Sequence, residues 1–253
     1  MSVKVYFIGC GPGDPELLTI KAKKMIEQAD VIIYADSLIS PEICGYARQG
    51  AEIHQSASLT LEEITDIIVK AVREGRMVAR LHSGDPGIYG ATQEQMMALD
   101  NHGIEYEVVP GVSSLFASAA VLKAELTVPE HSQTVIITRI EGRTPVPERE
   151  ALRKLAAHRS TMAIFLSVSM IDKVVAELRA GGYQPDTPAA VVYRASWEDE
   201  IVLRATLDTI VERVKAAGIA KQAIIFVGEF LSSKEKATRS KLYDESFKHG
   251  YRK

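Results

Sequence analysis

The sequence predicts an α/β protein built from two consecutive domains. Short apolar runs alternate with segments of helical period, and a second series of the same kind begins near Ala124. In the first half, the runs end in turns rich in Gly, Pro and Ser, so these turns gather at the carboxyl ends of the strands. That edge of an open parallel sheet is where ligands bind. We therefore expect α/β domains at 1–122 and 123–231, with the cofactor loops in the first, and a polar, basic tail at 232–253.

The first half justifies the α/β class element by element. Four apolar runs are predicted strands: Val3–Ile8, Asp30–Tyr34, Met77–Leu81 and Glu105–Val109. Helical periodicity predicts one helix over Glu16–Gln28 and a second that opens near Thr60 and ends at Gly75. Thr60 and Glu63 have the spacing of a capping box, which marks the start of the second helix.

The second half repeats the alternation with one difference. Four runs are predicted strands: Thr134–Thr138, Met162–Leu166, Ala189–Tyr193 and Ala223–Val227. A helix is expected over Met170–Ala180. Ile201, Leu203 and Ala205 alternate with polar neighbours close behind the preceding strand, which predicts an antiparallel hairpin and hence a mixed sheet.

Composition excludes several classes of function. The chain has 253 residues and a formal net charge of -3, with a pI near 6.1, which argues against a broad basic face for nucleic acid or an anionic membrane. Cys10 and Cys44 lack the spacing of a zinc site, so we expect no bound metal. No apolar run approaches the roughly 18 residues of a membrane span, and no targeting segment opens the chain, so a cytoplasmic location is expected.

The turn Gly9–Asp14 lies where a glycine-rich nucleotide loop would lie, between a strand and a helix. Its glycines do not have the offset of the dinucleotide fingerprint, and no Lys follows as in a P-loop. Pro12 also removes a backbone N–H that phosphate binding would use. The turn therefore either binds a cofactor that has no phosphate or is only a tight strand-to-helix connection.

Two further turns follow strands of the first half. His82–Gly90 is rich in residues that expose the backbone and fix its path, and Pro110–Ser114 again joins a strand to a helix. Each has a structural alternative, because the second could be an ordinary turn in which Asp85 caps a helix and Ser113 could be a helix N-cap. Three such turns on one expected edge favour a common binding site.

Three stretches together resemble the tetrapyrrole methylases: GCGPGDPELLTIKA from Gly9, SGDPGIYG from Ser83 and PGVSS from Pro110. The resemblance covers nearly the whole chain. It implies two α/β domains of the class III methyltransferase type, with S-adenosylmethionine folded up in a cleft between them, S-adenosylhomocysteine as product, and a homodimer. EGRTPVP from Glu141 and YRASWEDE from Tyr193 are similar to the branch that methylates carbon 11 of precorrin-4 or cobalt-precorrin-4 in cobalamin synthesis.

The resemblance also implies the site residues. The cofactor contacts fall on Pro12, Ser83, Gly84, Asp85, Ile88, Ser113, Ser114, Ser167, Tyr193 and Ala195. Asp36 is the candidate catalytic carboxylate, because it follows the second strand and matches an Asp of relatives that methylate uroporphyrinogen. Those relatives often carry Arg where Ser37 stands, and Asp36 could instead cap or fix its loop.

A tetrapyrrole substrate carries many carboxylates, which arginine binds through its forked donors. Arg139, Arg143 and Arg194 are the candidates, with a solvated basic loop as the alternative. Methyl transfer is an in-line displacement that needs alignment more than a strong acid or base. Methylation at another position of a tetrapyrrole, and a noncatalytic ligand-binding protein, remain the alternative functions.

Overall fold

The computed structural model describes residues 5–232, 247–248 and 250, and these form two compact units. The first unit runs to Ala117 and includes Ser196–Glu198, and the second takes the other described residues from Ser118 onward. The boundary predicted after Leu122 falls at the end of helix α5 (Ser114–Leu122), within which the two units divide. Most of the predicted tail lies outside the described residues.

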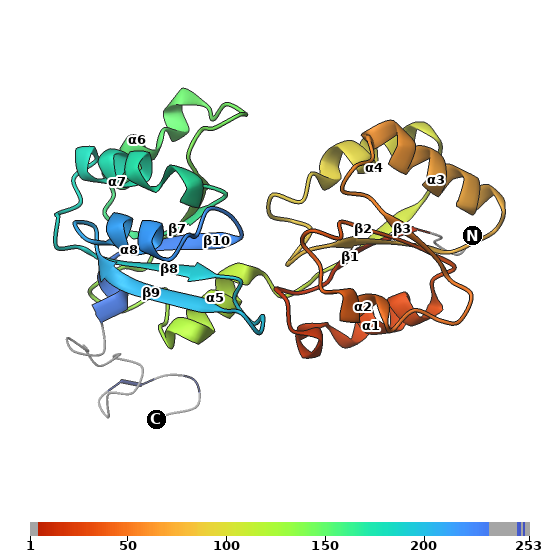
Figure 1. Cartoon of the computed structure of the whole chain (residues 1–253), viewed down its shortest axis with the longest axis horizontal. Coiled ribbons are helices and arrows are strands. Elements are labelled where there is room, and N and C mark those ends of the chain that lie inside the picture. The colour runs from red at the N-terminus through yellow and green to blue at the C-terminus, as the bar shows by residue number, and fades with distance from the viewer. Residues whose placement is uncertain (1–4, 233–246, 249, 251–253) are drawn as a thin grey trace. The chain divides into compact units, whose positions relative to one another are not determined.

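The first unit is built on a parallel sheet in the order β3-β2-β4-β1-β5 (Figure 1). The strands are β1 Val5–Gly9, β2 Val31–Tyr34, β3 Glu52–Gln55, β4 Val78–His82 and β5 Tyr106–Val109. Apolar periodicity did not predict β3, since Ile53 is its single apolar residue and is itself exposed. Because the strands are parallel, their carboxyl ends meet at one edge, as expected.

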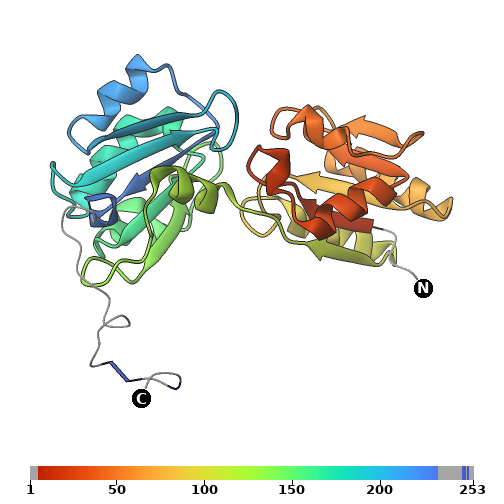
Figure 2. The same ribbon diagram turned by 90° about the horizontal axis from the view of Figure 1, so that it is seen from below.

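Helices cover both faces of this sheet, α1 and α2 on one and α3 and α4 on the other (Figures 1 and 2). Their bounds are α1 Ile20–Gln28, α2 Pro41–Cys44, α3 Leu61–Arg73 and α4 Thr92–Asn101. The capping box of Thr60 and Glu63 is confirmed. The predicted start of the first helix at Glu16 is wrong, because Thr19 caps α1 and Pro15–Leu17 forms a separate 3₁₀ turn.

The second unit has a mixed sheet in the order β6-β7-β10-β8-β9. The strands are β6 Val135–Arg139, β7 Thr161–Phe165, β8 Pro188–Tyr193, β9 Ile201–Thr206 and β10 Ala223–Val227. The predicted antiparallel hairpin is confirmed as the β8–β9 pair. Since β10 runs antiparallel to both β7 and β8, while β6 is parallel to β7, the carboxyl ends of β6, β7 and β8 share one edge.

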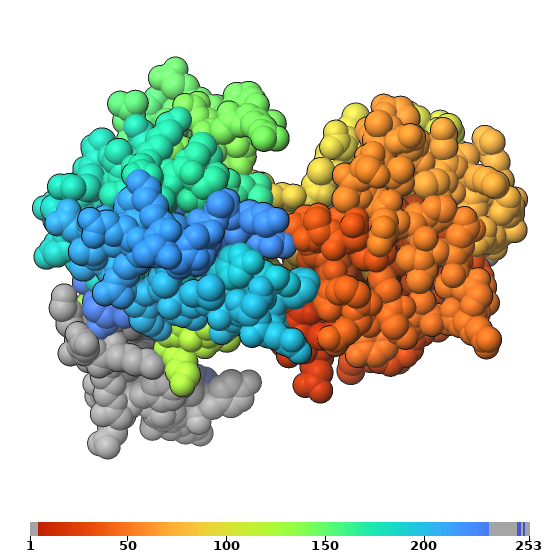
Figure 3. Space-filling model, viewed as in Figure 1, coloured from red at the N-terminus to blue at the C-terminus, as the bar shows by residue number. Residues whose placement is uncertain are grey.

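The core of the second unit lies between this sheet and helices α6 to α8. Beside α5, the helices are α6 Leu152–Ala156, α7 Ile171–Ala180 and α8 Ile210–Ala216, with 3₁₀ turns at Glu148–Glu150, Val168–Met170 and Glu229–Ser232. The segment between β6 and α6, in green, projects from the surface (Figures 1 and 3). The helices of the described residues are all too short or too polar to cross a membrane. The predicted α/β class is therefore confirmed for both units.

Candidate functional site

The first two glycine turns are bonded to each other at the carboxyl edge of the first sheet. The Cys10 amide donates to the carbonyl of His82 over 2.8 Å. Gly11 and Gly84 then exchange two backbone hydrogen bonds, of 3.2 and 2.7 Å, which extend the contact of β1 and β4 beyond their ends. The turns that the sequence placed on one edge therefore form one structure.

Glycine is required where the three turns meet. A Cβ atom on Gly9 would lie 2.5 Å from the amide nitrogen of Gly111, and a Cβ atom on Gly111 would lie 2.2 Å from the carbonyl oxygen of Gly84. Real Cβ atoms are essentially never found at such separations. Gly9 and Gly111 therefore allow a backbone-to-backbone approach that a side chain would block, whereas Gly84 contributes its carbonyl oxygen to the contact.

Asp85 links the second turn to the third. Its Oδ1 accepts a hydrogen bond from the Gly87 amide at 2.8 Å, and its Oδ2 accepts one from the Gly111 amide at 2.9 Å. Charge-assisted bonds to backbone amides are among the stronger hydrogen bonds in proteins. The carboxylate predicted to contact the cofactor thus has a structural task, and its contact with the cofactor stays a prediction.

The remaining predicted cofactor residues of the first unit differ in accessibility. Ser113 is buried, and its hydroxyl accepts the Leu115 amide at 3.2 Å, as a cap of α5 would. Ser83 is exposed, while Ile88 and Ser114 are half-buried. Ser83, Ile88 and Ser114 are thus at least partly accessible within the unit and Ser113 is not, and the cofactor contacts of all four stay predictions.

The first turn is held by a residue that sequence reasoning did not select. Trp197 belongs to the first unit, where its indole Nε1 donates to the carbonyl of Pro12 at 2.7 Å. A Cβ atom on Gly13 would lie 2.3 Å from the indole ring, so the ring rests directly on that glycine. The neighbouring Ser196 accepts the Asp14 amide at 3.0 Å. The sequence could have indicated this residue, because Trp197 is the single tryptophan of the chain and lies within YRASWEDE, which begins at Tyr193.

Two buried side chains with titratable nitrogens, Arg80 and His82, lie two residues apart on β4. Arg80 donates to Gln95 Oε1 at 2.9 Å and to Ser56 Oγ at 3.2 Å, and burial lowers its pKa to about 10. Burial and the nearby Arg80 charge lower the pKa of His82 to about 3, although a hydrogen bond with the Gly90 backbone opposes the shift. His82 is therefore neutral at physiological pH, and its buried Nε2 has no partner among the described residues.

Asp36 lies in the turn that follows β2, at the same edge as the three glycine turns. Its side chain is exposed, and it makes no hydrogen bond or ion pair with the described residues. The structure shows no capping or loop-fixing contact of the Asp36 side chain within the described chain, and its role as the catalytic carboxylate stays a prediction.

The second unit collects its predicted site residues at the shared edge of β6, β7 and β8. Ser167 is fully buried two residues beyond β7, and Ala195 is buried beyond β8. Arg194 lies over the Tyr193 ring and pairs with Asp199 at 2.7 Å. The hydroxyl of Ser167 is used internally, so any cofactor contact there would involve the backbone.

Arg139 and Arg143 have different surroundings although they lie four residues apart. Arg139 ends β6, and its guanidinium donates to the carbonyls of Ile140, Thr144 and Pro145. Arg143 is exposed and has no hydrogen-bond or ion-pair partner in the described chain. The structure therefore leaves Arg143 free to meet an anion and commits Arg139 to the backbone.

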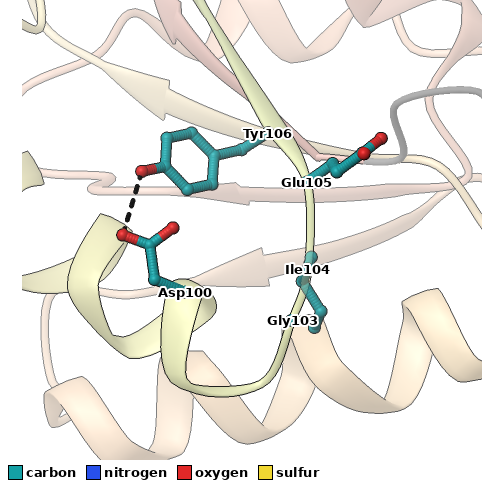
Figure 4. A pocket seen from close by; sticks show the side chains of 5 residues that line it. All are labelled: Asp100, Gly103, Ile104, Glu105 and Tyr106. Atoms are coloured by element: carbon teal, nitrogen blue, oxygen red, sulfur yellow. Dashed lines mark hydrogen bonds between the residues drawn. The ribbon is translucent and has the colours of Figure 1, made fainter.

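A separate cavity of about 490 Å³ lies at the opposite end of the first sheet. Figure 4 shows its lining: Asp100, Gly103, Ile104, Glu105 and Tyr106. The Tyr106 hydroxyl and Asp100 Oδ2 are 3.3 Å apart. Because Tyr106 begins β5, this cavity opens at the amino-terminal edge, away from the glycine turns. Within the described residues, no group of His, Cys, Asp or Glu has the arrangement of a metal site.

Residues 4–211 match the family model for tetrapyrrole (corrin/porphyrin) methylases. A curated relative, the cobalt-precorrin-4 C(11)-methyltransferase of Methanocaldococcus jannaschii, is 62% identical over 250 residues, which is 99% of this chain and 96% of the relative.

Two solved structures are also similar. A cobalt precorrin-4 methyltransferase from cobalamin biosynthesis matches with a TM-score of 0.88 and 48% identity, covering 90% of this chain and 95% of that one. The uroporphyrin-III C-methyltransferase of Thermus thermophilus, solved with S-adenosylhomocysteine, matches with a TM-score of 0.76 and 30% identity, covering 90% and 93%.

Replacement of Asp85 by asparagine should loosen the second and third turns together. An amide offers only one acceptor oxygen, so its NH₂ group must face either the Gly87 or the Gly111 amide, and one charge-assisted bond is lost. We expect a loss of about 1–3 kcal/mol in the free energy of unfolding, measured by urea denaturation, together with weaker binding of S-adenosylhomocysteine by calorimetry. Asp66→Asn, on the exposed face of α3, is the matched control. Equal unfolding free energies for the two variants would show that the bridge is unimportant.

Gly13→Ala should displace the indole of Trp197. The added methyl group would occupy space now filled by the ring, so the hydrogen bond to Pro12 must break. Overpacking of this kind costs about 1–3 kcal/mol. Since Trp197 is the only tryptophan, its fluorescence emission should shift to the red as the ring becomes solvated. Trp197→Phe, which keeps a ring but not the donor, should lose less stability than Gly13→Ala. An unshifted spectrum in Gly13→Ala would contradict the contact.

His82 should make the protein less stable in acid. Its pKa falls from an ordinary value of 6.5 to about 3 in the fold, so between these pH values the unfolded chain binds a proton that the folded chain does not. Stability then falls as the pH falls through this window, by up to about 1.4 kcal/mol per pH unit. His82→Gln cannot titrate, so its unfolding free energy should depend less steeply on pH between about 6 and 4. Parallel pH profiles of the two proteins would exclude this contribution.

Proposed function

The chain belongs to the tetrapyrrole methylase family, and we propose that it transfers a methyl group from S-adenosylmethionine to carbon 11 of cobalt-precorrin-4 in cobalamin synthesis. The observation that carries this proposal is the 62% identity, over 99% of the chain, to a curated enzyme with that name. Among the solved relatives, identity falls from 48% to 30% when the substrate changes from cobalt precorrin-4 to uroporphyrin-III. This difference favours the precorrin-4 branch.

The proposed cofactor suits the turns of the first unit. S-adenosylmethionine has no phosphate group, which agrees with a first turn in which Pro12 offers no N–H and no P-loop lysine follows. The close approach of Gly9, Gly84 and Gly111 packs backbone against backbone at this edge, and a Cβ atom at Gly9 or Gly111 would clash with it. The relative solved with S-adenosylhomocysteine supports the same choice. When bound, this cofactor would supply a methyl group carried on a sulfonium. The leaving group of the transfer would be the neutral thioether.

The residues of the chain would then align the reactants rather than activate them strongly. Ser83, Ile88 and Ser114 are the accessible candidates for holding the cofactor in the first unit. Asp36, free of structural bonds within the described chain, would accept at a carboxylate oxygen the proton that the methylated macrocycle releases. Because the side chain is exposed, its carboxylate oxygens are accessible to that proton.

Substrate binding would depend on forked guanidinium groups that meet the carboxylates of the macrocycle. Arg143 needs to break no existing bond to do this, whereas Arg194 must exchange Asp199 for the substrate. The cobalt ion belongs to the substrate and needs no ligand from the protein. The cleft between the domains and the homodimer stay predictions from the family resemblance, and the cytoplasmic location stays a prediction from the sequence.

The test is an anaerobic incubation with S-adenosylmethionine labelled with ¹³C at its methyl group, followed by NMR location of the label. Separate reactions contain cobalt-precorrin-4 and metal-free precorrin-4. We expect label at carbon 11, formed faster from the cobalt complex. Label at another carbon would overturn the branch, and binding of the cofactor without transfer to either substrate would favour a different methyl acceptor.

The same assay tests the role of Asp36 separately from the proposed methyl transfer. Asp36→Asn should lower kcat by about 100-fold or more and leave the affinity for S-adenosylhomocysteine unchanged, since no structural bond of the described chain is removed. Asp66→Asn again serves as the control. Full activity of Asp36→Asn would reject the carboxylate as proton acceptor without affecting the proposed methyl transfer.

A further inference from the structure

We propose that Arg139 and Ser167 are positioning residues that hold segment 140–146 in the shape in which it presents Arg143 to the substrate, and that Arg139 itself does not bind the substrate. The inference rests on the proposed function, because it is there that Arg143 meets substrate carboxylates. It replaces the expectation from sequence that both Arg139 and Arg143 bind the substrate.

The guanidinium of Arg139 is occupied by the chain that follows it. One terminal nitrogen donates to the carbonyls of Ile140 at 3.3 Å and Thr144 at 3.2 Å, and the other donates to Pro145 at 2.8 Å. The planar fork thus joins two consecutive carbonyls near the end of the segment to the end of β6. A lysine, whose ammonium is a single point charge, cannot reproduce this bridge.

Ser167 fixes the start of the same segment. Its hydroxyl accepts the Ile140 amide at 2.9 Å and donates to the Phe165 carbonyl at 2.6 Å. The last residue pair of the parallel β6–β7 ladder is Arg139 with Phe165, so Ser167 continues the ladder by one further link. The side chain is fully buried, so its bonds are shielded from competition with water.

The middle of the segment is also held. The Gly142 amide donates to the Thr144 carbonyl at 3.3 Å, and a Cβ atom on Gly142 would lie 3.2 Å from the terminal methyl of Met170. Glu141 pairs with Lys173 of α7 at 3.2 Å. The segment is therefore fixed at both ends and at its turn, although it projects from the surface (Figure 3).

Arg143 is the one cation of this braced segment that is available to a ligand. It is exposed and makes no hydrogen bond or ion pair with the described residues, so its five N–H donors face solvent. Arg139 would have to give up three carbonyl bonds before it could bind a carboxylate through the same nitrogens. Binding by a side chain on a fixed segment also loses less conformational entropy than binding by a mobile loop.

Hydrogen exchange of the substrate-free protein tests, without using activity, whether Arg139 and Ser167 hold segment 140–146 in place. Arg139→Lys and Arg139→Gln should both speed hydrogen exchange in the peptide that spans 140–146 by about tenfold. Each variant loses the guanidinium fork that bridges the carbonyls, and a tenfold change corresponds to about 1.4 kcal/mol. The Ile140 and Gly142 amides are the reporters, since both are hydrogen-bonded. Arg143→Lys and Arg143→Gln should leave exchange unchanged. Ser167→Ala should speed exchange at Ile140 in particular.

Steady-state kinetics with the tetrapyrrole substrate distinguish the roles of the two arginines. If Arg139 acts through its fork, Arg139→Lys raises KM about as much as Arg139→Gln. Arg143→Lys, which keeps the charge, should raise KM less than Arg143→Gln. The proposal is overturned if Arg139→Lys preserves both KM and slow exchange while Arg139→Gln raises KM, since Arg139 would then act on the substrate as a charge. The exchange result stands even if the substrate proves to be a different molecule, so failure of the brace and failure of the proposed function can be told apart.

Discussion

The site in the first unit depends on the direct contact of three backbone turns. Gly9 and Gly111 lie so close to the neighbouring backbone that neither position has room for a side chain, and hydrogen bonds between Gly11 and Gly84 lock two of the turns in register. A surface made from backbone at the carboxyl edge of a parallel sheet offers fixed donors and acceptors with little side-chain entropy to lose.

Several residues of that edge hold the turns in place through hydrogen bonds to the protein. Asp85 uses both carboxylate oxygens on backbone amides, Ser113 caps a helix, and Trp197 holds the first turn through Pro12. Methyl transfer needs closely aligned reactants, and hydrogen bonds that hold the shape of the turns favour such alignment. The residues that remain free of such tasks within the described chain, Asp36 among them, are the better candidates for chemistry.

In the second unit, polar side chains at the strand edge likewise form bonds with other groups of the protein. Parallel β6, β7 and β8 bring Arg139, Ser167 and Arg194 to one edge, and each already has internal partners. A guanidinium is costly to leave unpaired when it is half-buried, but it can remain solvated when it is exposed. Arg139 therefore satisfies its donors on backbone carbonyls, while Arg143 satisfies its own in water until an anion binds.

The sequence by itself determined the α/β class, the hairpin of β8 and β9, and the edge on which the three glycine turns gather, because these depend on local periodicity and on strand direction. It placed the start of α1 too early and did not predict β3, whose stability comes from pairing with β2 rather than from its own apolar pattern. Only the tertiary structure decided that the side chains of Asp85, Ser167 and Arg139 form hydrogen bonds with the protein's own backbone. It also decided that the Trp197 ring lies against Gly13. The physical reason is that a hydrogen bond depends on which groups meet in space, and residues separated by 185 positions, such as Trp197 and Pro12, leave no periodic trace of that contact in the chain.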